Sequence, residues 1–212
     1  MKTLFFLLFP FLFFSQQEDE TAMDFYLETG EKISLIQFLE TKDYSKNIDL
    51  EKFIDGKPAK VLYNRIRSGY LTAEQLNSVR KFLSLDDNKV LDKDFLVIQY
   101  LTTKPKEQLK KGIKGYVLHK DHFKNVIKKY NAELYYVSDE RNFPKISKFD
   151  NKFRKWIKDK DAVFSKLFYP AETLYGNFTI ISKDGRYISY LGEHSPEQVY
   201  QYLNFMLRNR RY

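Results

Sequence analysis

Residues 176–207 read GNFTIISKDGRYISYLGEHSPEQVYQYLNFML, and this stretch decides the fold. It predicts two strands, at residues 177–182 and 186–191, because β-branched and aromatic residues dominate both runs. Asp184-Gly185 stands between them and favours a two-residue type I′ turn, in which both central residues take positive φ. We therefore expect an antiparallel hairpin here.

A capped helix is expected directly after the hairpin. Ser195 suits the N-cap, Pro196 suits the first helical position, and Gln198 completes a capping box. An apolar stripe follows at helical spacing, made of Val199, Tyr202, Leu203, Met206 and Leu207. The unit is well specified as structure but contains no catalytic motif.

Residues 1–17 have the pattern of a secretory signal peptide. Lys2 gives a short basic start, and residues 4–14 are apolar apart from Pro10. The run is shorter than the roughly 17–25 residues of a membrane-spanning helix, so no transmembrane span is expected. The pattern predicts an exported protein, periplasmic or extracellular. The alternative is a buried N-terminal strand or helix.

The chain has 212 residues and no cysteine. An exported chain of this kind has no disulfide, no thiol nucleophile and no cysteine-bound metal, and we expect no cofactor. Its stability must come from packing, for which 19 Phe and 16 Tyr supply apolar area.

Residues 18–90 predict a small α+β segment, and residues 91–212 predict the main domain. The expected elements of the first part are a strand at 24–28, a helix at 34–41, a loop at 43–57, a strand at 59–66 ended by Ser68-Gly69, and a helix opened by the capping box Thr72 to Gln75. Those of the second part are a buried strand at 94–101, a helix at 119–130, a strand at 132–138, a helix at 148–168, and the final hairpin and helix. The order β-α-β-α-β-β-α predicts an α/β fold, with a mixed sheet flanked by helices.

From about Asp94 to Arg208 the chain resembles the thioredoxin-like superfamily, especially its exported redoxin-type domains. The resemblance rests on the strand FLVIQY at residues 95–100, on the hairpin with Lys183-Asp184-Gly185, and on the closing helix. It implies a thioredoxin-like mixed sheet.

Two catalytic features of that family are missing. The family carries Cys-x-x-Cys in the loop after the first central strand, where this chain has Pro105, Lys106, Glu107 and Gln108. The family also has a cis-proline just before the hairpin, a place that falls here on Gly176 or Asn177. The resemblance therefore implies the fold without thiol-disulfide chemistry.

The three histidines give no clear metal site. His119 and His122 stand three residues apart, as a metal pair would, but the sequence offers no third ligand and a solvated helix face is favoured. His194 precedes the cap Ser195 and is expected to be exposed in a loop.

Charge is unevenly distributed along a chain of net charge +8. Residues 18–55 hold 11 acidic and 4 basic residues, whereas residues 93–166 hold 19 basic and 9 acidic residues. The predicted basic face consists of Lys104, Lys106, Lys110, Lys111, Lys114, Lys120, Lys124 and Lys128. It is either a solvated surface that attracts the acidic segment or a contact for an anionic partner. Nucleic acid is not expected, because lysine dominates over arginine and the chain has an export signal.

Three functions remain open. The leading hypothesis is a non-catalytic binding or scaffold module of the bacterial envelope, whose partner is an unknown protein or an anionic envelope component. The second is a non-thiol enzyme whose cleft is formed with the N-terminal segment, which would bring titratable residues with shifted pKa together in a pocket. The third is a domain that binds an anionic surface through its lysines, with affinity that falls steeply with salt.

Overall fold

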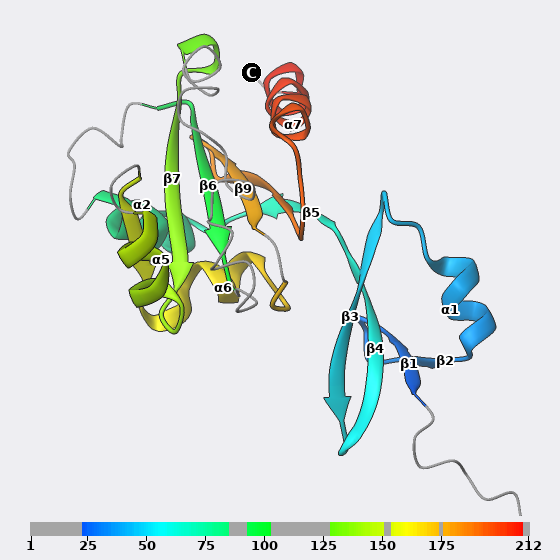
Figure 1. Cartoon of the computed structure of the whole chain (residues 1–212). Helices are drawn as coiled ribbons and strands as arrows, with labels where there is room; N and C mark the ends of the chain where they lie inside the picture. Colours follow the sequence, from blue (N-terminus) through cyan, green and yellow to red (C-terminus); the bar gives the residue numbers. More distant parts are fainter. Residues whose placement is uncertain (1–22, 85–92, 103–127, 151–153, 174–175, 210–212) are drawn as a thin grey trace, which may run out of the picture.

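The computed structural model describes residues 23–84, 93–102, 128–150, 154–173 and 176–209. These residues form an α/β structure with two mixed sheets, one of four strands and one of six. Figure 1 shows the smaller sheet, built from the first part of the chain, beside the larger one. The α/β class predicted from the sequence is confirmed.

The four-stranded sheet has the order β2-β1-β4-β3. Its strands are β1 (Asp24–Leu27), β2 (Lys32–Ile33), β3 (Asn47–Ile54) and β4 (Lys57–Asn64). The strands β1 and β4 are parallel, and the other neighbours are antiparallel. Helix α1 (Leu35–Thr41) lies against this sheet, where Phe38 packs on Phe25 with ring centroids 4.8 Å apart.

The six-stranded sheet has the order β5-β10-β9-β6-β7-β8. Its strands are β5 (Ile66–Tyr70), β6 (Phe95–Leu101), β7 (Ala132–Asp139), β8 (Trp156–Asp159), β9 (Asn177–Ser182) and β10 (Arg186–Tyr190). The strands β6, β7 and β8 are parallel to one another. The other pairs are antiparallel: β9 with β6, β10 with β9, and β5 with β10. Every residue of β6 is buried, as its apolar run predicts for a central strand.

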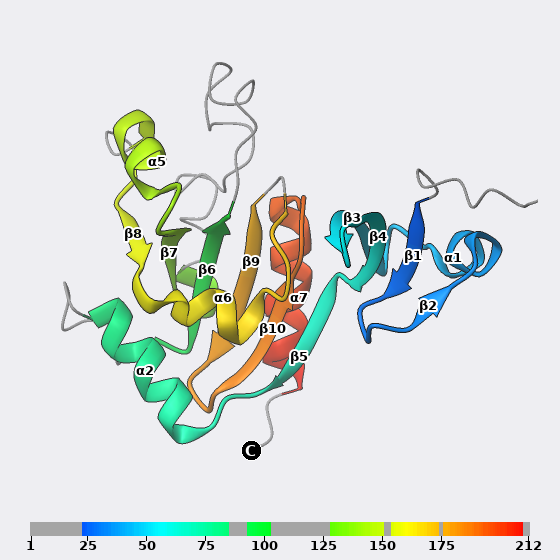
Figure 2. The same ribbon diagram turned by 90° about the horizontal axis from the view of Figure 1, so that it is seen from below.

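Helices cover both faces of the six-stranded sheet, which Figure 2 shows from below. Helices α5 (Phe143–Asp150) and α7 (Pro196–Arg208) supply Ile146, Val199, Leu203 and Met206 to the core on one face. Helices α2 (Ala73–Ser84) and α6 (Val163–Phe168) supply Val79, Leu83, Phe164 and Phe168 to the core on the other. Val61 and Tyr63 of β4 join this second core, so the two sheets share apolar contacts.

The closing hairpin and helix form where the sequence predicts them. Ser195 caps α7, and its capping box with Gln198 is complete. The predicted type I′ turn is wrong. Such a turn needs two residues with positive φ, and only Gly185 has positive φ among the residues between the two strands. The Gly185 N–H donates to Ser182 O at 2.9 Å, so the loop has three residues, Lys183 to Gly185, with glycine at its left-handed position.

Three further predictions are wrong. Residues 43–57 are not a loop but contain β3, and Ser68-Gly69 does not break a strand but lies inside β5. Residues 148–168 are not one helix, since β8 and a 3₁₀ turn (Lys160–Ala162) lie between α5 and α6. The spacing of Trp156, Ile157 and Phe164 fits a helix, but strand pairing with β7 determines the structure of Trp156 to Asp159.

The division of the chain at residue 90 stays a prediction. The six-stranded sheet takes its edge strand β5 from before that point. Within the described ranges no helix is long and apolar enough to cross a membrane, and the expected signal at residues 1–17 lies outside them.

Candidate functional site

Polar side chains gather where β6, β7 and β8 end. Thr102 follows β6, Asp139 ends β7, and Asp159 ends β8 directly opposite Asp139 in the parallel ladder. In open α/β sheets, ligands bind outside the carboxyl ends of the strands. The structure places a cleft of about 1000 Å³ there.

Asp159 is fixed by three donors. Its carboxylate accepts hydrogen bonds from the Tyr100 hydroxyl at 2.7 Å, from Phe164 N at 3.1 Å and from Ser165 N at 3.2 Å. Asp159 is only 2% exposed. Because it bonds to Tyr100 of β6 and to two N–H groups of α6, it holds the start of α6 against β6. Burial, together with the negative charge of Asp159, raises the pKa of Tyr100, so that the hydroxyl stays protonated and donates.

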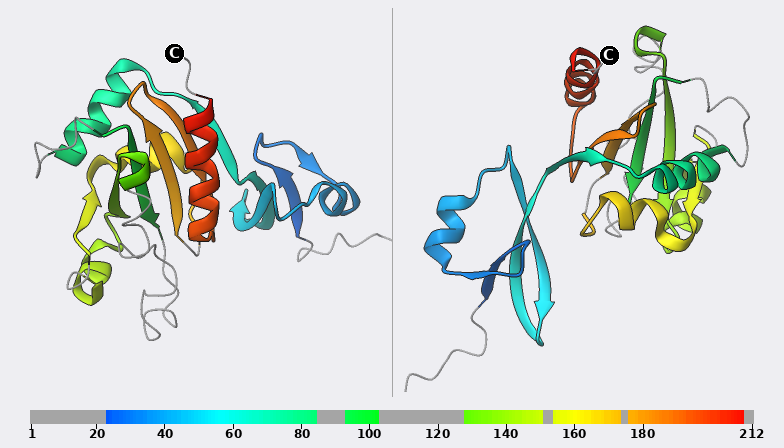
Figure 3. Two further views of the ribbon diagram at one scale, coloured as in Figure 1. Left: turned by 90° about the horizontal axis from the view of Figure 1, so that it is seen from above. Right: turned by 180° about the vertical axis from the view of Figure 1, so that it is seen from behind.

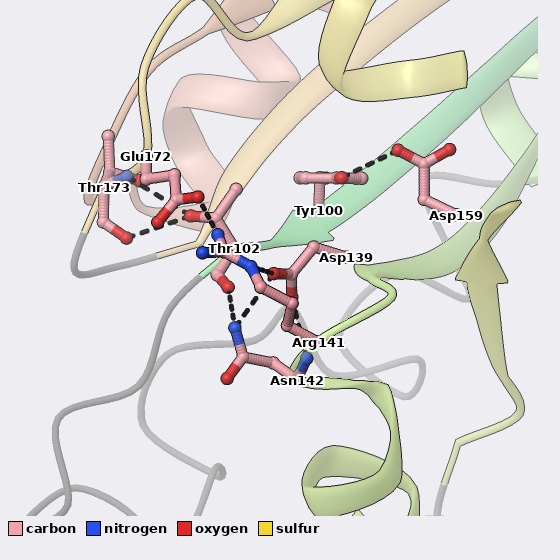
Figure 4. A network of polar contacts seen from close by, with 8 residues as sticks. All are labelled: Tyr100, Thr102, Asp139, Arg141, Asn142, Asp159, Glu172 and Thr173. Carbon is pink, nitrogen blue, oxygen red and sulfur yellow. Dashed lines mark hydrogen bonds and ion pairs between the residues drawn. The ribbon is translucent and has the colours of Figure 1, made fainter. Parts of the chain in front are cut away.

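Asp139 lies at the centre of a second polar cluster (Figure 4). It accepts hydrogen bonds from the Asn142 backbone N–H at 3.3 Å and side-chain Nδ2 at 3.0 Å. The Arg141 guanidinium reaches both Asp139, at 3.4 Å, and Glu172. Burial raises the pKa of Asp139 more than these partners lower it. The cleft therefore contains one carboxyl group that holds its proton more tightly than an ordinary aspartate.

Backbone and hydroxyl groups tie the floor of this region together. Thr102 Oγ1 donates to Thr173 O at 3.0 Å and accepts from Thr173 N at 3.2 Å, and Thr102 O accepts from Asn142 Nδ2. Thr173 Oγ1 donates to Asn177 Oδ1 at 2.9 Å, which also accepts from Gly192 N at 2.7 Å. The end of β6 is thus joined to the start of β9.

The opposite wall comes from the N-terminal part of the chain. Strand β3 contributes Leu50, Glu51 and Lys52 to the cleft lining. Six acidic and three basic side chains line the cleft: Glu51, Asp139, Glu140, Asp159, Asp161, Glu172, Lys52, Arg141 and Lys166. Carboxylates therefore outnumber cations in it.

The expectation of an exposed His194 is wrong. Its ring is half-buried, with Nδ1 3.0 Å from Gly192 O and Nε2 3.1 Å from Gln99 Oε1. The ring also makes an edge-to-face contact with Phe178, with 4.7 Å between the ring centroids. Burial lowers the pKa of His194 to about 4.

This burial predicts a pH dependence of stability. The unfolded chain protonates His194 near its ordinary pKa of 6.5, whereas the folded protein does so only near 4. The free energy of unfolding should therefore fall as the pH drops from 6.5 to 4, by up to about 3 kcal/mol. Urea unfolding at a series of pH values measures this loss. His194→Gln should flatten the curve between pH 6.5 and 5, and an equal slope in both proteins would contradict the prediction.

The structure tests the sequence-predicted site residues only in part. Asn177 is fully buried as the first residue of β9, and no cis peptide occurs in the described residues. Lys128 is exposed. The predicted redox-loop position at residues 105–108, His119, His122 and the lysines from Lys104 to Lys124 lie outside the described residues. The part of the chain that is described holds no group of side chains suited to a metal ion.

Of the cleft residues, the sequence marks only Asp139 and Glu140, as paired carboxylates that sequence alone does not bring to a cleft. Asp139 and Asn142 follow a predicted strand with the spacing of a local cap, which was a usable signal. Asp159 gave no such signal, because the sequence predicts a helix over residues 148–168. A comparison with known protein families and with curated proteins gives no match for this sequence.

Proposed function

We propose that this protein is an exported thioredoxin-like domain that binds its ligand without redox chemistry. The parallel pair β6 and β7, the antiparallel hairpin of β9 and β10 beside β6, and the closing helix α7 support the fold assignment. The chain has no cysteine, so thiol-disulfide exchange is chemically impossible for it.

The binding site in this proposal is the cleft at the carboxyl ends of β6, β7 and β8. The observation that carries the proposal is the convergence there of polar residues from three strand ends, facing a second wall from β3. Asp159 and Thr102 are fixed by buried hydrogen bonds, so this floor is pre-organised. The excess of carboxylates favours a ligand that carries positive charge or several hydrogen-bond donors.

A non-thiol enzyme is the second candidate, and two features of the cleft favour it. The N-terminal segment does line the cleft, and the pKa of Asp139 is raised there. Asp159 is poorly suited as a second catalytic carboxylate, since three donors already occupy it. Binding is therefore the better-supported function.

The test is capture of ligands from the envelope extract of the source organism by the immobilised mature protein, washed at low and high salt. A double variant, Glu51→Lys with Glu172→Lys, reverses two exposed charges in the cleft. Glu31→Lys with Glu193→Lys makes the same charge change at exposed sites that do not line it. We expect one ligand that survives high salt and is lost only with the cleft variant.

The other outcomes separate the alternatives. Release of all ligands at high salt from every variant would place binding on the predicted lysine face instead. No retained ligand at either salt would leave the enzyme candidate as the one to pursue. Either result would overturn the binding-cleft proposal.

A further inference from the structure

The two walls of the cleft belong to different sheets. Strand β3, with Leu50, Glu51 and Lys52, is the edge of the four-stranded sheet, and the remaining lining belongs to the six-stranded part. Strand β4 ends at Asn64 in one sheet and β5 begins at Ile66 in the other. Arg65 alone joins them, and Figure 3 shows this crossing from two sides.

Arg65 forms hydrogen bonds to both sheets. Toward the four-stranded sheet, its backbone N–H donates to Lys46 O at 2.8 Å and its Nε donates to Asn47 O at 3.1 Å. Toward the six-stranded sheet, its carbonyl accepts from Leu191 N at 2.7 Å and its Nη1 donates to Leu191 O at 3.1 Å. The guanidinium also lies over the Tyr190 ring, 5.7 Å from its centroid. One side chain thus bridges both sheets. Its donors are charged, and hydrogen bonds from charged donors are stronger than those from neutral ones.

Other contacts cross the same junction but constrain it differently. Glu28, just after β1, pairs with Arg67 of β5 at 2.7 Å. Val61 and Tyr63 pack in the core shared with the six-stranded sheet. Apolar contacts hold the sheets together without fixing one angle, because the hydrophobic effect is not directional. The Glu28–Arg67 pair and the bonds of Arg65 are directional, and Arg65 is distinguished by one side chain that donates both to Asn47 O and to Leu191 O.

We propose that Arg65 is a positioning residue that sets the distance between the two walls of the cleft. Loss of its side chain frees the four-stranded sheet to turn about residue 65, which moves β3 relative to the ends of β6, β7 and β8. This inference rests on the proposed function for its biological meaning. The wall distance itself is measurable without any ligand.

The absence of native cysteine allows a direct measurement. Lys57→Cys on β4 and Lys148→Cys on α5 place two spin labels at exposed positions that do not line the cleft. Pulsed electron paramagnetic resonance should give one narrow distance distribution in this background. Adding Arg65→Ala should broaden the distribution and shift its mean. Arg80→Ala should leave it unchanged, because Arg80 bonds Lys183 O within the six-stranded part.

The single tryptophan separates positioning from a general loss of structure. Trp156 lies on β8, the edge of the six-stranded sheet opposite to β5, where Arg65 joins it. Its fluorescence in Arg65→Ala should match that of the background protein while the label distance changes. An unchanged distance in folded Arg65→Ala would overturn the proposal, as would a distance change accompanied by an altered Trp156 signal. Neither result depends on whether the cleft binds a ligand, so a failure here is distinct from a failure of the proposed function.

Discussion

Asp159→Ala is expected to lower the free energy of unfolding by about 3–5 kcal/mol, because a buried donor left without its acceptor costs about 1–3 kcal/mol. Three donors would lose their acceptor at once: the Tyr100 hydroxyl, Phe164 N and Ser165 N. Tyr100 and Phe164 are fully buried, so water does not replace the lost partner. Urea unfolding followed by Trp156 fluorescence measures the change.

A double-mutant cycle with Tyr100→Phe shows whether the two side chains act together. Tyr100→Phe alone leaves Asp159 with two donors and should cost about 1–2 kcal/mol. In the Asp159→Ala background it should cost much less, because the hydroxyl is already unpaired. Glu140→Ala is the exposed control, since it loses a surface ion pair with Lys158 and should change the free energy of unfolding very little. Additive effects of the two buried substitutions would contradict the coupling.

The closing hairpin and helix are the part of the fold that the sequence predicts best. Several local signals agree there: strand composition, a turn pair and a capping box with Ser195 and Gln198. Even so, the turn type was wrong. Asp184-Gly185 is compatible with a two-residue or a three-residue loop, and the pairing of Tyr187 with Ile181 selects the longer one.

Strand β8 was missed for a physical reason. It has only four residues, too few to show the alternation of a strand, and its apolar side chains continue a helical spacing. Its partner β7 decides the outcome by pairing residue for residue, up to Asp139 opposite Asp159. Propensity is a weak guide where tertiary pairing satisfies the backbone.

Apart from the local signal at Asp139, the cleft could not be assembled from the sequence, because its residues meet only through topology. Leu50 to Lys52, Asp139 to Arg141 and Asp161 to Glu172 come from distant parts of the chain. The sequence alternative of a cleft made with the N-terminal segment named no residues for that cleft. The uneven charge distribution favoured a basic face of lysines as the site instead. Most of these lysines lie outside the described residues.

The junction at Arg65 gives the second large expected effect. Gly192 has φ of +93°, and a Cβ built there would lie 2.9 Å from Arg65 Nη1 and 3.0 Å from Ile48 Cδ1. Gly192→Ala therefore adds backbone strain, about 1–2 kcal/mol for an L-residue in the left-handed region, and pushes Arg65 away from Leu191 O. Losing a hydrogen bond from a charged group costs about 1.5–3 kcal/mol more. The total expected loss is about 2.5–5 kcal/mol in urea unfolding.

Gly30→Ala separates the two terms of this loss. Gly30 has nearly the same φ, +88°, but no atom lies within 4 Å of a Cβ built there. It should therefore show the backbone strain alone, about 1–2 kcal/mol. The excess loss of Gly192→Ala over Gly30→Ala then reports the contacts with Arg65 and Ile48 together, and it should shrink when both substitutions are made in Arg65→Ala. Equal losses in the presence of Arg65 would mean that the crowding is relieved without breaking the junction.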